Sequence, residues 1–130
     1  TLFYDELLIL VSKNSQLSKK KSISLKNITK YPLALNNTKH LPFVLPKEEK
    51  FNIFIDTNST ELYLKTIEEN LAIGFSTKSI AKNSYFSINK NIIPIPITNG
   101  FLLQIDCVTK KNTPLAANEV EFLKIIQTVC

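Results

Sequence analysis

Residues 59–75 constrain the fold of this chain more than any other segment, because they have the pattern of a capped helix that runs directly into an apolar strand. Ser59 can accept a free backbone N–H group at the helix start, and Glu61 complements the positive end of the helix dipole. Asn70 is suited to the left-handed conformation in which helices end. The run from Leu71 to Phe75 is continuously apolar, as in strands covered on both faces. This joint predicts an α/β domain.

Strands and helices alternate along the rest of the chain. We expect strands at Leu7–Val11, Pro32–Leu35, Phe51–Ile55, Ile92–Ile97 and Phe101–Thr109, and helices near residues 24–29, 60–70, 78–82 and 117–129. In the last of these helices, Val120, Leu123 and Ile126 share one face. Pro94 and Pro96 cannot donate backbone hydrogen bonds, which restricts their strand to an edge or to an irregular strand. The alternation favours a parallel or mixed sheet flanked by helices.

Several segments together resemble the effector-binding domain of LysR-type transcriptional regulators. The matching segments are Leu17-Ser18, Ile23–Ile28, Tyr31–Leu35, the turn Asn70–Ile73, Ile93–Ile97, Leu102–Lys111 and Thr113–Ala116. Their order and spacing agree with the family's pattern, and the similarity runs almost from end to end.

The resemblance implies a periplasmic-binding-protein-like (type II) α/β fold, with a mixed sheet flanked by helices and an incomplete second subdomain. Residues 1–30 would form a strand and crossover of the proximal subdomain, and residues 31–106 the distal α/β subdomain. Residues 107–130 would supply the return strand and the C-terminal helix of the proximal subdomain. The family's DNA-reading domain would precede Thr1, so we expect a chain truncated on its N-terminal side that reaches DNA only through that separate domain and works as a homo-oligomer.

Composition argues against several other classes. The net charge is +5, yet all 16 basic residues are Lys. Arg is the preferred residue for reading guanine and clamping phosphate, so its absence argues against a nucleic-acid reader in this segment. No apolar run is long enough to span a membrane, which favours a soluble, cytoplasmic protein.

We find no motif for a cofactor, no metal-ligand spacing and no catalytic constellation, so we expect no enzyme. Glu68 and Glu69 point about 100° apart on a helix, too far for a carboxylate pair, and are interpreted as surface charges.

Short polar residues follow the predicted strands, where open α/β sheets bind ligands. The candidate ligand-binding residues are Ser12 after the first strand, Asn36 and Asn37 after the second, Asp56, Thr57 and Asn58 after the third, and Ser76 after the fourth. The resemblance matches Ser12 and residues 56–58 to positions that contact the effector. Asn58 and Ser59 could equally serve only to cap the following helix.

The preferred interpretation is an effector-sensing domain of a LysR-type regulator, which binds a small metabolite and thereby controls a DNA-bound oligomer. A solute-binding protein of the same fold is the alternative, and a small α/β enzyme is a weaker one. A signal peptide encoded upstream would favour the solute-binding protein, whereas a helix-turn-helix would exclude it.

Overall fold

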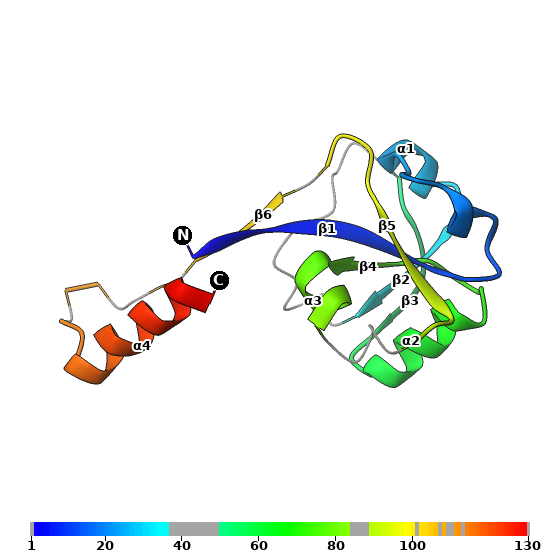
Figure 1. Cartoon of the computed structure of the whole chain (residues 1–130). Helices are drawn as coiled ribbons and strands as arrows, with labels where there is room; N and C mark the ends of the chain where they lie inside the picture. Colours follow the sequence, from blue (N-terminus) through cyan, green and yellow to red (C-terminus); the bar gives the residue numbers. More distant parts are fainter. Residues whose placement is uncertain are drawn as a thin grey trace.

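A computed structural model describes residues 2–36, 50–83, 89–100, 102–106, 108, 111–112 and 114–129 (Figure 1). In chain order, its elements are β1 (Phe3–Ser12), the 3-10 helix η1 (Gln16–Lys19), α1 (Leu25–Ile28), β2 (Pro32–Asn36), β3 (Asn52–Thr57), α2 (Thr60–Glu68), β4 (Gly74–Thr77), α3 (Lys78–Asn83), β5 (Ile92–Pro96), β6 (Leu102–Ile105) and α4 (Ala117–Val129). The expected alternation of strands and helices is confirmed, but β1 begins at Phe3 rather than at the expected Leu7, and β6 ends at Ile105, short of the expected Thr109.

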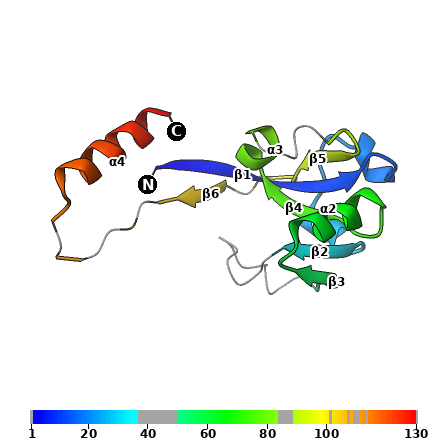
Figure 2. The same ribbon diagram turned by 90° about the horizontal axis from the view of Figure 1, so that it is seen from below.

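The long strand β1 is the centre of the sheet. Its first half, Phe3–Glu6, pairs antiparallel with β6, and from Leu7 onward it lies between β4 and β5, antiparallel to both. β1 is the only described strand with which β5 pairs, in agreement with the edge position expected from its two prolines. Figure 2 shows β1 and β6 leading together away from the other strands.

A parallel group of strands lies next to this antiparallel one. β2 pairs in parallel with β3, and a parallel bridge between Leu33 and Ile73 joins β2 to the residues just before β4. β2 and β3 run parallel to β4, whereas β1 runs antiparallel to it. The arrangement of strands is therefore mixed, as the sequence predicts.

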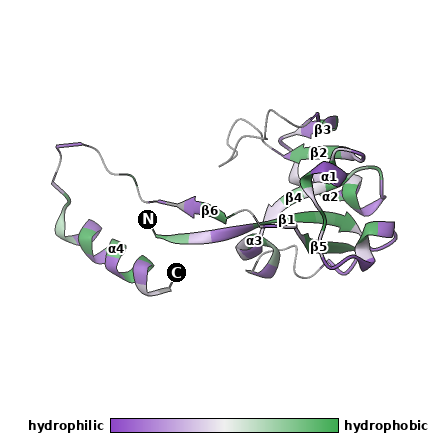
Figure 3. Cartoon of the chain, turned by 90° about the horizontal axis from the view of Figure 1, so that it is seen from above, coloured by the Kyte–Doolittle hydropathy of each residue, from purple (hydrophilic) through white to green (hydrophobic). Residues whose placement is uncertain are grey.

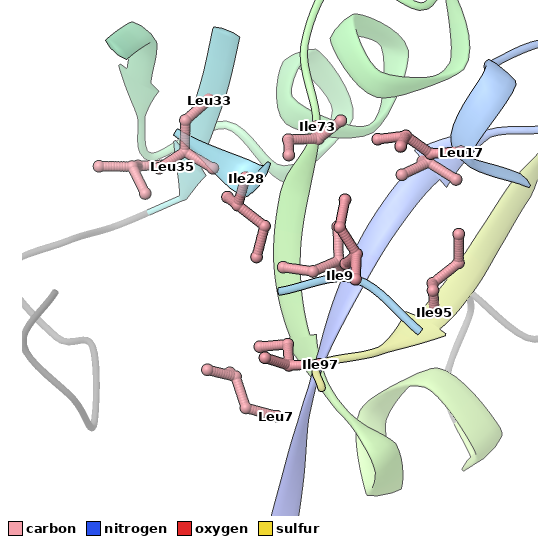
Figure 4. Packing of buried hydrophobic residues seen from close by; sticks show 11 residues of the cluster. Leu7, Ile9, Leu17, Ile28, Leu33, Leu35, Ile73, Ile95 and Ile97 are labelled. Carbon is pink, nitrogen blue, oxygen red and sulfur yellow. The ribbon is translucent and has the colours of Figure 1, made fainter. Parts of the chain in front are cut away.

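The hydrophobic core lies on both faces of β1, which explains the continuous apolar run from Leu7 to Val11. Ile9 and its odd-numbered neighbours pack against residues of η1, α1, β2 and β5 (Figure 4). Leu10 packs in a second cluster, to which α2 contributes Tyr63, Leu64 and Ile67. Figure 3 shows the hydrophobic colouring of β1 giving way to polar residues where the strand approaches β6.

The helix-to-strand joint forms largely as expected, but its strand begins later. Ser59 is the N-cap of α2 and accepts a hydrogen bond from the Leu62 N–H at 3.2 Å, and Asn70 has φ +60°. The expected start at Leu71 is wrong: Leu71 is 53% exposed, and β4 begins at Gly74. The reason is that the Leu71 N–H still bonds back to the Thr66 carbonyl, so the chain becomes extended only after that turn.

Tyr63 explains why a glycine starts β4. Its ring is buried, and its hydroxyl donates a hydrogen bond of 2.8 Å to the Phe75 carbonyl. Burial raises the pKa of the phenol well above its ordinary value, so the group remains a neutral donor. A Cβ on Gly74 would meet this hydroxyl and lie 2.6 Å from Cδ1 of Ile67. The absence of a side chain therefore lets α2 approach β4 closely.

The packing also bears on the expected subdomain boundaries. Leu17, Ile23 and Ile28 lie before residue 31 but belong to the same core cluster as Leu33 and Ile97. We therefore propose that the distal unit starts near residue 7, where β1 leaves β6.

In Figures 1 and 2 the last helix, α4, lies beyond the outer ends of β1 and β6, with its C-terminal end near the start of β1 and far from β2, β3, β4 and β5. The shared apolar face expected for it is covered only in part. Leu123 and Ile126 are half-buried, whereas Val120 is 38% exposed.

We predict that Gly74→Ala destabilises the protein by about 1–3 kcal/mol, because the new methyl group overpacks the contact between α2 and β4. Gly100→Ala is the matched control: Gly100 has φ +60°, but a Cβ at this position would have no atom within 4 Å, so only backbone strain of about 1 kcal/mol applies. Urea denaturation measures both. Equal, small effects would show that α2 and β4 are not in close contact.

A polar edge next to β1 and β6

Four of the candidate residues gather at one edge of the sheet, which we call the polar edge: Asn36, Asp56, Thr57 and Ser76. Asn36 lies opposite Thr57 in the parallel register of β2 and β3, one residue beyond the pair Leu35 and Asp56. Leu33 bridges Ile73, so Asn36 and Ser76, each three residues further along, lie at the same end of the sheet. Asn58 follows Thr57 directly and is exposed. The carboxyl ends of three strands thus meet here, as expected for an open α/β sheet.

Hydrogen bonds orient part of this edge. The Thr57 hydroxyl accepts from the Ser59 N–H at 3.0 Å, and the Asn36 amide donates to the Thr60 hydroxyl at 3.4 Å. The cap of α2 is Ser59, so the cap role considered for Asn58 belongs to its neighbour. Asp56 is exposed, and Ser76 is half-buried. The edge presents amide, hydroxyl and carboxylate groups at the ends of the strands.

Ser12 lies at the opposite end of the sheet. Leu7 pairs with Thr77 of β4, and Ser12 is five residues further along β1, which corresponds to about 16 Å. Its hydroxyl is buried, donates to the Glu68 carbonyl at 3.1 Å and accepts from the Asn14 N–H at 3.1 Å. These bonds connect the end of β1 to the end of α2. The structure therefore does not bring Ser12 together with the polar edge, and Asn37 lies outside the described residues.

Glu68 differs from its interpretation as a surface charge. It is half-buried, and its carboxylate accepts a hydrogen bond of 2.8 Å from the Asn91 amide. Glu69 is exposed, as expected, and pairs with Lys65 at 3.0 Å. The two carboxylates have separate partners and so do not act as a pair.

Asp5 connects the paired strands β1 and β6 to the start of α3. It is only 7% exposed, and its Oδ1 accepts a hydrogen bond of 3.1 Å from the Ser79 N–H. Burial alone would raise the pKa of this carboxyl, but hydrogen bonds from the Thr77 hydroxyl and from Ser79 outweigh it and hold the pKa below its ordinary value. Asp5 is therefore a carboxylate at neutral pH, stabilised by the residues that directly follow the polar edge.

A cavity of about 390 Å³ adjoins this junction, lined by Tyr4, Asp5, Glu6, Lys78, Ser79, Lys82 and Leu102. A second cavity, of about 240 Å³, lies at the other end of the strands, next to Ser15, Tyr31 and Asn70–Ile73. Within the described residues, no three His, Cys, Asp or Glu side chains are grouped to hold a metal ion. No helix in the described ranges is long and apolar enough to cross a membrane.

Local sequence patterns gave no sign of Asp5 or Tyr63. Asp5 bonds to a residue 74 positions away, and Tyr63 reaches the backbone of the next strand. A signal for Asp5 is the helix start at Thr77-Lys78-Ser79, because the free N–H groups of a helix start need a hydrogen-bond acceptor nearby.

No protein-family model and no curated protein matches the sequence. Solved structures match the fold. HinK, a LysR family transcriptional regulator from Pseudomonas aeruginosa, aligns over 96% of this chain and 45% of its own, with a TM-score of 0.72 and 11% identity. The effector binding domain of QuiR in complex with shikimate aligns over 97% and 61%, with a TM-score of 0.64 and 15% identity. The Synechocystis PCC6803 CcmR regulatory domain in complex with 2-PG aligns over 98% and 64%, with a TM-score of 0.67 and 10% identity.

These matches confirm the periplasmic-binding-protein-like α/β fold, in the form found in effector-binding domains of LysR-family regulators. The chain spans 45% to 64% of the length of these three structures. At 10% to 15% identity, the likeness concerns the fold.

We predict that Asp5→Ala lowers the free energy of unfolding by about 2 kcal/mol at pH 7, because it removes the charged acceptor of the Thr77 hydroxyl and the Ser79 N–H. The pKa of Asp5 is lower in the folded than in the unfolded protein, so this stabilisation is complete above about pH 5 and is lost as the pH falls through the folded-state pKa. The difference between variant and parent should therefore shrink toward pH 3.

Urea denaturation at several pH values measures this difference. Glu121→Gln, on the exposed surface of α4, is the control and should change the unfolding free energy by less than about 0.5 kcal/mol throughout. A deficit in Asp5→Ala that stays constant down to pH 3 would contradict the role given to the ionised carboxylate.

Proposed function

We propose that this chain is part of the effector-sensing domain of a LysR-type transcriptional regulator, and that the polar edge forms one wall of the effector site. The observation that carries the proposal is the match of nearly the whole chain to regulatory domains of that family, two of them solved with small ligands. The gathering of polar groups at the strand ends beside the hinge supports it.

The chemistry of the edge suits a small polar metabolite. Asn36 and Thr57, with Asn58 directly after Thr57, offer neutral donors and acceptors, Ser76 offers a hydroxyl, and Asp56 offers a carboxylate. The paired strands β1 and β6 lead from this unit toward α4, so a second unit carried by these hinge strands would face the edge and supply the opposite wall. Ligands of two-domain α/β proteins bind in such crevices, where both walls remove them from water.

The whole protein would act as a sensor rather than an enzyme. We infer that it functions as a homo-oligomer in the cytoplasm and contacts DNA through a separate N-terminal domain. The absence of Arg from this chain supports a division of labour in which the present segment does not read DNA itself.

We predict that Asn36→Ala and Thr57→Val each weaken effector binding about 5- to 10-fold in the intact protein, because each removes one neutral hydrogen bond. Ser12→Ala is the matched control: it also removes a hydroxyl bond, but at the other end of β1, and should leave affinity within about twofold. A panel of small acids, sugars and amino acids, including shikimate, is screened by thermal shift, and binding is then quantified by calorimetry.

Affinity must be compared at temperatures where every variant is folded, since each substitution also costs some stability. If Ser12→Ala abolishes binding while both polar-edge variants retain it, the effector site lies elsewhere.

A further inference from the structure

Asp5 lies where two strand pairings of β1 meet. Its backbone is opposite Leu103 in the pairing with β6, and two residues later Leu7 is opposite Thr77 in the pairing with β4. The hinge strands and the distal sheet are therefore continuous through this short stretch. A side chain here can contact both parts of the molecule.

The Asp5 side chain contacts the distal sheet through groups that are themselves fixed. Thr77 is buried, and its hydroxyl accepts from the Ile80 N–H at 3.4 Å while it donates to the Asp5 carboxylate. The same carboxylate accepts from the Ser79 N–H at 3.1 Å. Thr77 directly follows Ser76 in the chain, so the polar edge is next to the residue that bonds to Asp5.

The neighbouring ion pair cannot serve the same purpose. Glu6 and Lys78 are 3.7 Å apart, and the Lys78 side chain is 64% exposed. Exposed pairs of this kind contribute little, because solvent screens them and long side chains lose entropy when they are held. Of the two side-chain contacts described between β1 and α3, the hydrogen bond of the buried Asp5 is therefore the stronger one.

We propose that Asp5 is a positioning residue that couples the polar edge to the hinge: its carboxylate makes the end of β4 and the β1–β6 pair move as one body. This inference rests on the proposed function, because it gives a route by which a ligand bound at Ser76 would change the position of the β1–β6 pair and of the second unit that the pair carries. A simple helix-capping role would instead confine the effect of Asp5 to the first turn of α3.

Amide hydrogen exchange on the intact protein separates the two roles. We expect Asp5→Ala to speed exchange about tenfold or more both in α3, at Ser79 and Ile80, and along the ladder of Phe3–Glu6 with Leu102–Ile105, because charged hydrogen bonds of this kind hold both parts. Core amides of Ile9 and Leu10 should stay within about twofold.

Thr77→Val gives the decisive comparison, because it alters the polar-edge side only. It should also speed exchange in the β1–β6 ladder, and the double variant should exceed Asp5→Ala alone by no more than about twofold, since both act through one network. Thr66→Val is the control: Thr66 is also buried, and its hydroxyl bonds within α2 to the Leu62 carbonyl. It should leave the ladder unchanged.

Faster exchange confined to α3, additive effects of Asp5 and Thr77, or a uniform rise that includes Ile9 would each overturn the coupling. If Asp5→Ala does not fold, Asp5→Asn replaces it: the amide oxygen keeps one acceptor, and a smaller acceleration at the same two places is expected. The effector titrations of Asn36 and Thr57 variants do not involve Asp5, so a failure here is distinguishable from failure of the proposed function.

Discussion

The pairing of β1 with three strands is the interaction on which the rest of this structure depends. One ten-residue strand pairs with β6 through its first half and with β4 and β5 through its second. It is buried on both faces in that second half, so it organises two hydrophobic clusters at once. It also decides where the strand ends lie. Because β1 pairs antiparallel with β4, the carboxyl ends of β2, β3 and β4 lie at the end of the sheet where β1 enters it.

That geometry decides which polar residues belong together. A sequence shows that Ser12, Asn36, Thr57 and Ser76 each follow a strand, but not which way each strand runs. Parallel strands bring Asn36, Thr57 and Ser76 to one edge, whereas the antiparallel β1 carries Ser12 to the other. The sequence therefore predicts that each of these residues ends a strand, whereas which of them share an edge depends on the strand directions, which only the fold shows.

Local patterns predicted the elements well, because their causes are local. Ser24 and Ser59 cap the helices that follow them, Asn70 ends α2 with positive φ, and α4 has its expected bounds. The late start of β4 depends on a backbone bond from Leu71 to Thr66, and the need for Gly74 depends on Tyr63 across the joint. Contacts of this kind, like that between Asp5 and Ser79, arise only once distant segments pack, so no spacing rule reports them.

The carboxyl ends of β2, β3 and β4 are central to the proposed function, because they would form the effector-binding wall. A crystal structure of the intact protein with its effector tests this most directly. We expect ligand atoms within hydrogen-bond distance of at least two of Asn36, Thr57 and Ser76, with the hinge strands β1 and β6 alongside. A ligand bound instead near Ser12 and Asn70, at the opposite end of the strands, would contradict the proposal.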